Sequence, residues 1–143
     1  MEKKAAADRL QRAIIHAPER GKVLKLLAKP GELVGAQQPI LQMADTDRMA
    51  VIAEVYETDI GKVHLGGRAV ITGRALKYEA LTGRVVHIGD MVGKNRVYDA
   101  DPMAAADRRV VEVKIQLDQA EPAAHLINLQ VTVEISPEGS TSQ

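Results

Sequence analysis

The chain has 143 residues, of which 45% are hydrophobic, and its 19 basic and 19 acidic side chains give a formal net charge of zero. This balance leaves no overall electrostatic attraction to nucleic acid or anionic lipid, so no nucleic-acid partner is expected. Cys, Phe and Trp are absent, which excludes disulfides, thiolate chemistry and most base-stacking platforms. No apolar run of about 18 residues and no signal-peptide core is present, so we expect no signal or anchor within this chain and no route of its own out of the cytoplasm.

The N-terminal third combines a helix with two short strands. Residues 2–12 are rich in Ala, Lys, Arg, Glu and Leu, which are good helix formers. The pattern of Lys22–Ala28 predicts a strand that is buried on much of both faces. Pro39–Met43 predicts another short strand.

Longer strands are predicted from Met49 onward, and turn residues separate them. Several short strands of this kind favour a small antiparallel barrel or sandwich. The last two alternate strictly between apolar and polar residues, which predicts one solvent-exposed face. Asp90–Arg108 is predicted to be a polar loop, and 136–143 a disordered tail. The predicted strands are Met49–Tyr56, Arg68–Leu76, Leu81–Ile88, Arg109–Leu117 and Asn128–Ile135.

The segment Val55–Ile71 predicts the end of a strand, one helical turn, a glycine corner and the start of a new strand. The Thr58 hydroxyl can cap the turn, and Asp59 lies favourably near the positive end of the helix dipole. Gly66 and Gly67 allow the positive φ that a chain reversal needs. The turn has a single apolar face, formed by Ile60 and Val63.

Candidate catalytic and metal-binding groups form no recognisable motif. The four histidines lack the i, i+3 or i, i+4 spacing of a helical metal site. The acidic loop 99–107 lacks the central Gly and terminal Glu of an EF-hand. Gly89–Asn95 has too few residues between its glycines for a phosphate loop, and Asn95 replaces the Ser or Thr that would hold Mg²⁺. The sequence therefore offers no case for an enzyme, and no metal or cofactor is expected.

Two ordered segments carry a family resemblance. The first holds Ala17-Pro18, Gly21, Val23, Gly31, Val34, Pro39–Leu41 and Asp45, and the second is Val55–Ile71, followed by Leu81–Gly89. In this order they resemble the periplasmic adaptors of bacterial export pumps, the haemolysin D-type (HlyD family) membrane fusion proteins. The resemblance covers roughly residues 5–135. It is closest to the DevB-like adaptors of cyanobacterial ABC exporters, which export heterocyst glycolipids, over Val55–Gly61, Arg109–Ile115 and Asn128–Val131.

The resemblance implies a mainly β fold: half a lipoyl/biotinyl-like domain plus a small antiparallel β-barrel, with a short N-terminal helix. In such adaptors a membrane anchor, the first lipoyl half and a helical hairpin come before these parts, so the chain is expected to be a C-terminal fragment. Where the family has Pro-Gly before the last strand, this chain has Asn128-Leu129, so the resemblance does not fix that turn. The implied domains are 1–12 (remnant of a helical hairpin), 13–47 (second lipoyl half), 48–135 (barrel) and 136–143 (tail).

The implied function is connective. Such adaptors link an inner-membrane ABC transporter permease to a TolC-like outer-membrane channel, which they reach through the hairpin that is absent here. They assemble as homo-oligomers, expected to be hexamers, in the periplasm, and the full-length protein is anchored in the inner membrane. Glycolipid is the implied cargo. Contact surfaces are expected in Glu57–Gly67 and in the loop Asp90–Arg108, with the candidate residues Glu57, Asp59, Lys62, His64, Gly66, Asp90, Lys94 and Arg96.

Two alternatives remain open at this stage. A lipoyl-like carrier or accessory domain of a multienzyme complex would need a lysine at the tip of a tight hairpin, and the candidate tip Met43–Arg48 has none. A free-standing β binding module of unknown ligand is the other alternative. In either case the edge strands of half a lipoyl domain would be prone to pair with another copy.

Overall fold

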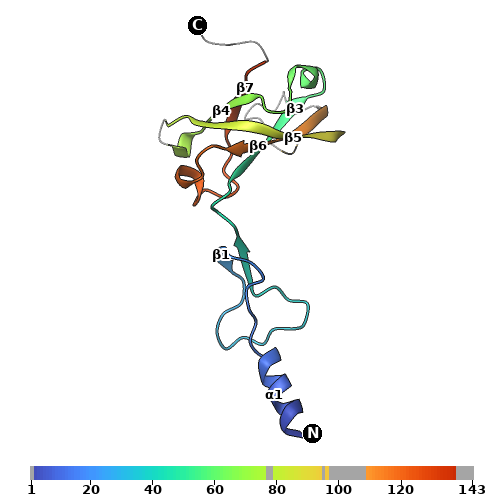
Figure 1. Ribbon diagram of the computed structural model, residues 1–143, viewed down its shortest axis with the longest axis vertical. Coiled ribbons are helices and arrows are strands. Elements are labelled where there is room, and N and C mark those ends of the chain that lie inside the picture. Colours follow the sequence, from blue (N-terminus) through green and yellow to red (C-terminus); the bar gives the residue numbers. More distant parts are fainter. Residues whose placement is uncertain (1, 77–78, 95, 97–108, 138–143) are drawn as a thin grey trace. The chain divides into compact units, whose positions relative to one another are not determined.

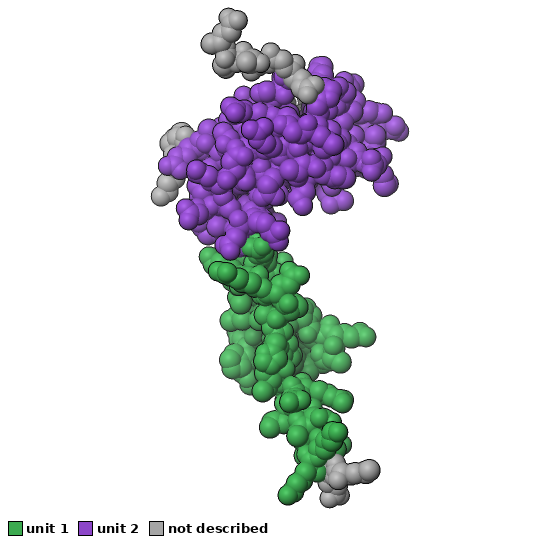
Figure 2. All heavy atoms as spheres, viewed as in Figure 1, with its two compact units in different colours: residues 1–45 green, residues 46–143 purple. Residues whose placement is uncertain are grey.

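The computed structural model describes residues 2–76, 79–94, 96 and 109–137. Over these residues the fold is mainly β with one short α-helix, as predicted, and the chain divides into two compact units, residues 1–45 and 46–143 (Figure 2). The elements are α1 (Glu2–Arg12), β1 (Lys22–Leu26), β2 (Leu41–Ala44), β3 (Ala50–Tyr56), η1 (Ile60–Lys62), β4 (Arg68–Thr72), η2 (Arg74–Leu76), β5 (Leu81–Lys94), β6 (Arg109–Leu117), η3 (Glu121–Ala123) and β7 (Thr132–Ile135).

The first unit consists of α1 and an antiparallel pair formed by β1 and β2. None of the described side chains of residues 3–45 is buried, so the predicted burial of β1 on both faces is wrong for this chain. Val23 is 48% exposed and Leu26 67% exposed, because two strands alone have no second layer to cover them. The large exposed apolar residues of this unit are Leu10, Ile14, Ile15, Val23, Leu26, Leu27, Leu33, Val34 and Leu41.

The second unit contains a five-stranded antiparallel sheet in the order β3-β6-β5-β4-β7 (Figure 1). β6 pairs with β3 on one side and with β5 on the other. Its odd-numbered residues from Val111 to Leu117 are buried, whereas Glu112 and Lys114 are exposed. The alternation predicted for this strand is therefore confirmed, and its bounds agree with the predicted Arg109–Leu117.

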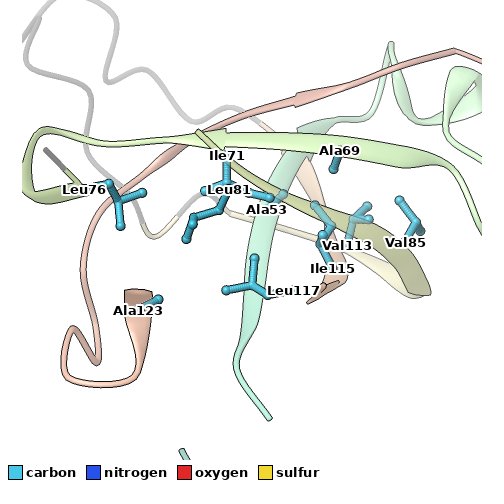
Figure 3. Packing of buried hydrophobic residues seen from close by; sticks show 10 residues of the cluster. All are labelled: Ala53, Ala69, Ile71, Leu76, Leu81, Val85, Val113, Ile115, Leu117 and Ala123. Atoms are coloured by element: carbon cyan, nitrogen blue, oxygen red, sulfur yellow. The ribbon is translucent and has the colours of Figure 1, made fainter. Parts of the chain in front are cut away.

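The hydrophobic core lies on the inner face of this sheet. Its largest fully buried side chains, Ile71, Val85, Val113 and Ile115, come from β4, β5 and β6. The short helices η2 and η3 contribute one residue each, Leu76 and Ala123. Figure 3 shows the ten residues of this cluster: Ala53, Ala69, Ile71, Leu76, Leu81, Val85, Val113, Ile115, Leu117 and Ala123.

β5 and β6 approach each other closely at Gly83. A Cβ added there would lie 2.6 Å from the carbonyl oxygen of Gln116 and 2.8 Å from Cγ2 of Ile115. Any side chain would therefore push the two strands apart at the level of the fully buried Ile115. Glycine at this position is a packing requirement of the core.

The predicted bounds of β4, β5 and β7 are wrong by four residues or more, whereas those of the other strands differ by one or two at most or agree. β4 ends at Thr72 instead of Leu76, because the chain turns into η2 and so places Leu76 in the core with only 5% exposure. β5 runs to Lys94 instead of ending at Ile88, and its register with β6 shifts between Ile88 and Val92. β7 begins at Thr132, four residues after the predicted start, because Asn128 has a φ of 62°. Asn is one of the few residues that tolerate this left-handed conformation.

We expect Ile115→Ala to lower the free energy of unfolding of the second unit by about 2–5 kcal/mol, because it empties a site with no exposure. The matched control is Ile52→Ala on β3, whose side chain is 53% exposed and which should cost at most about 1 kcal/mol. Urea unfolding followed by tyrosine fluorescence measures both, since all three tyrosines lie after residue 46. Equal losses in the two variants would contradict this assignment of the core.

Candidate functional site

The first predicted contact segment connects β3 to β4 and contains the 3₁₀ helix η1. The N-cap residue of η1 is Asp59, and no side-chain hydrogen bond caps this helix. The predicted capping role of Thr58 is therefore wrong. The Asp59 carboxylate instead accepts a hydrogen bond of 2.7 Å from Nζ of Lys62, three residues further on. The turn thus presents a carboxylate and an ammonium side by side.

The turn and the glycine corner of this segment are both held against the sheet. Ile60 and Val63 are partly buried against the core, as their spacing predicts. Gly66 has a φ of 80° and donates a backbone hydrogen bond of 2.8 Å to the carbonyl of Val85, whereas Gly67 needs no positive φ. The N–H of Val85 donates in turn to the carbonyl of Gly67 at 2.9 Å, which ties the glycine corner to β5.

A shallow cleft of about 300 Å³ lies beside η1 at the end of β3. Apolar side chains from β3 and β7 and the half-buried Val63 form most of its wall. Asp59 and Lys62 belong to its lining, with side chains that are 47% and 72% exposed. An ion pair this exposed adds less than about 1 kcal/mol to stability, so both charges remain available to a partner. The lining residues are Glu54, Val55, Tyr56, Asp59, Lys62, Val63, Val133, Ile135 and Pro137.

The second predicted contact segment is only partly a loop. Asp90 and Lys94 are exposed residues of β5, and Lys94 lies opposite Arg109. The carbonyl of Arg109 accepts a hydrogen bond of 3.1 Å from the N–H of Glu57. The structure therefore brings Glu57 and Lys94, one from each predicted segment, to the same end of the sheet, on either side of β6. Residue 95 and residues 97–108 of the predicted loop lie outside the described residues.

Arg96 follows the end of β5 and contacts two carboxylates on the outer face of the sheet. Glu54 on β3 and Glu112 on β6 lie directly opposite each other, an arrangement of like charges that destabilises a strand pair. The N–H of Arg96 donates to Oε1 of Glu54 at 2.8 Å, and its guanidinium lies 3.7 Å from Oε1 of Glu112. Arg96 therefore offsets the repulsion that the register creates.

The eight predicted residues do not form one site. Asp59 and Lys62 line the cleft described above, and Arg96 lines a second, larger cavity. The remaining five, Glu57, His64, Gly66, Asp90 and Lys94, line neither of these two cavities.

The larger cavity is an apolar groove of about 660 Å³, which sequence reasoning missed. It lies between the start of β3 and the segment 126–131, and Arg96, Asn128 and Gln130 are its polar side chains. Leu129 and Val131 fall within the predicted strand Asn128–Ile135, whereas in the structure the left-handed Asn128 turns the segment aside before β7 begins. The other lining residues are Met49, Ala50, Val51, Ile52, Ile71, Leu76, Leu81, Leu117, Ala123, Leu126, Ile127, Leu129 and Val131.

The described residues form two clefts that could serve as binding surfaces. Among them, no group of three or more His, Asp or Glu residues is arranged to hold a metal ion. No helix in the described part of the chain has the length and apolar character to cross a membrane. Met43–Arg48 was the candidate hairpin tip for a carrier lysine, but it connects β2 to β3, which belong to different sheets. It is therefore not the tip of a hairpin.

No family model matches the chain. Multidrug resistance protein MdtN of Escherichia coli strain K12 is 27% identical over 139 residues, which cover 90% of this chain and 40% of MdtN. MdtN of Shigella flexneri is 25% identical with the same coverage. The chain thus spans about two fifths of the length of the curated relatives it matches.

Two solved structures share the fold. The periplasmic adaptor protein EmrA matches with a TM-score of 0.57 and 23% identity, over 94% of this chain and 36% of EmrA. The membrane fusion protein Spr0693 of Streptococcus pneumoniae R6 matches with a TM-score of 0.61 and 14% identity, over 95% of this chain and 55% of that chain. The resemblance to membrane fusion proteins is therefore confirmed, and the closer resemblance to DevB-like adaptors stays a prediction.

We expect Gly66→Ala to lower the free energy of unfolding by about 1–3 kcal/mol, because the φ of 80° is strained for any residue with a Cβ. Gly61→Ala in η1 is the matched control, since neither glycine has an atom within 4 Å of an added Cβ and Gly61 has no positive φ. That variant should be neutral or slightly stabilising. Thermal unfolding of the two variants tests the glycine corner, and equal melting temperatures would refute it.

Proposed function

We propose that this chain, a homologue of MdtN with the fold of membrane fusion proteins, is part of an adaptor subunit of a bacterial export system. The observation that carries the proposal is that sequence and structural similarity to such proteins extend over nine tenths of the chain or more. An adaptor connects other proteins and needs no catalytic group. The described surface, with a charged cleft and an apolar groove, suits such a role.

We further propose the domain assignment given by the resemblance: a hairpin remnant in 1–12, half a lipoyl-like domain in 13–47, a β-barrel in 48–135 and a tail in 136–143. The division of the chain after Asp45 supports the second boundary. The absence of any buried side chain among the described residues 3–45 also supports it, because half a domain cannot enclose a core.

The proposed partners are an inner-membrane ABC permease, a TolC-like outer-membrane channel reached through a hairpin outside this chain, and further copies of the adaptor in a ring, proposed to be a hexamer. The subunit would act in the periplasm, held by an inner-membrane anchor in the full-length protein. The DevB-like resemblance supports glycolipid as the cargo. The name of MdtN, a multidrug resistance protein, supports a drug-like compound instead.

We propose that the cleft beside η1 is a contact between neighbouring copies in this ring. Asp59 and Lys62 present opposite charges at its lining, and their mutual pairing contributes little to stability. Opposite charges at the edge of an apolar cleft are typical of the rim of an interface between proteins.

Sedimentation velocity of the whole chain over a range of concentrations tests this contact. We expect self-association, and Lys62→Glu should weaken it roughly fivefold or more, because two carboxylates would then face the partner. Arg74→Glu is the control, since it makes the same change of charge at an exposed residue that lines neither cavity. A wild-type chain that stays monomeric at high concentration would contradict the ring.

A further inference from the structure

Two arginines lie directly opposite each other on the outer face of the sheet. Arg68 on β4 pairs in register with Arg84 on β5, and both are exposed. Their chain neighbours Ala69 and Val85 are buried, with exposures of 0% and 2%, so by strand alternation both guanidinium groups project from the other face. Like charges in directly opposed positions destabilise a strand pair, so this pair carries an energetic cost.

The register extends this pair into a patch across three strands. Arg84 lies opposite Gln116 on β6, and the next outer pair along the same strands is His87 with Lys114. These residues are exposed except for the half-buried Gln116. We call Arg68, Arg84, His87 and Lys114 the outer basic patch.

The outer basic patch has no partner among the described residues. None of its four members forms an ion pair or a side-chain hydrogen bond with another described residue. Three carboxylates border the patch: Glu134 lies opposite Val70, Glu112 lies 3.7 Å from Arg96, and Asp118 accepts a hydrogen bond of 2.7 Å from the Thr82 hydroxyl. The patch therefore concentrates positive charge on a chain whose formal net charge is zero.

The chemistry of the patch selects the ligand. An anion between Arg68 and Arg84 would turn their repulsion into attraction, and guanidinium groups bind phosphate oxygens in a bidentate way. Exposed aliphatic side chains adjoin the cations: Ile52, 53% exposed, lies opposite Lys114, and Val86, 48% exposed, lies between Arg84 and His87. Cations beside exposed apolar side chains are typical of protein surfaces that bind anionic membranes.

We propose that the outer basic patch binds the phosphate groups of anionic phospholipid headgroups. The patch would hold this face of the sheet against a membrane surface. This inference goes beyond the adaptor role and does not depend on it, because it concerns only the chain and a lipid surface.

The test is co-sedimentation of the whole chain with vesicles of phosphatidylcholine that contain phosphatidylglycerol, at low salt. We expect binding to these vesicles and little binding to phosphatidylcholine alone. Arg68→Gln with Arg84→Gln should weaken binding about 25-fold, since each cation near an anionic membrane contributes roughly fivefold. Arg9→Gln with Arg12→Gln makes the same two changes in α1 and should change binding less than about twofold.

Unfolding does not confound this test, because removing the opposed charges should leave the urea midpoint of the double variant unchanged or higher. Arg68→Lys with Arg84→Lys keeps both charges but loses the bidentate geometry, so it should bind more weakly than the wild type and more tightly than the Gln double variant, and raised salt should abolish the remaining binding. Equal binding to both kinds of vesicle, equal losses in the two Gln double variants, or binding of inorganic phosphate without binding of vesicles would each overturn the proposal.

Discussion

The pairing of β6 with both β3 and β5 is the constraint on which the second unit depends. This strand supplies Val113 and Ile115, whose side chains have no exposure, and the closest approach of its neighbour is possible only because position 83 is glycine. The same pairing also determines which charged side chains lie opposite each other on the outer face of the sheet. Glu54 meets Glu112, and His87 meets Lys114, because the buried residues between them fix the register. Core packing and surface charge are thus two consequences of one alignment.

The two units differ in how much of their own apolar surface they bury. The five-stranded sheet encloses a core, whereas Leu26 on β1 and Leu33 in the connection to β2 are exposed by 67% and 98%. Apolar side chains in water favour association, so a surface of this kind is typical of one that another element covers. This contrast supports the proposal that residues 13–47 are half of a larger domain, and it agrees with the proposed connective role of the protein.

Residue patterns predicted α1 and each strand that the structure describes, and the strict alternation of Arg109–Leu117 predicted its burial as well. The ends of the strands were harder to predict from the sequence. Leu76 lies outside β4 because it packs into the core, and Asn128 lies outside β7 because its backbone is left-handed. Surface charge could not be predicted from composition. Arg68 and Arg84 lie opposite each other because of a strand register that only the folded sheet specifies. A net charge of zero gives no sign of this local concentration of positive charge. Asp59 and Lys62, two candidate contact residues three apart in one turn, form an ion pair in the structure.

The most direct test of the adaptor account is photo-crosslinking from position 64 in the native cell, followed by identification of the partner by mass spectrometry. His64 lies exposed in the connection between β3 and β4, so a photoreactive side chain there should leave the core intact. The account predicts crosslinks to an inner-membrane export transporter or to a second copy of the chain, recovered from the membrane fraction. Crosslinks only to soluble enzymes of a multienzyme complex would contradict it and favour the carrier alternative.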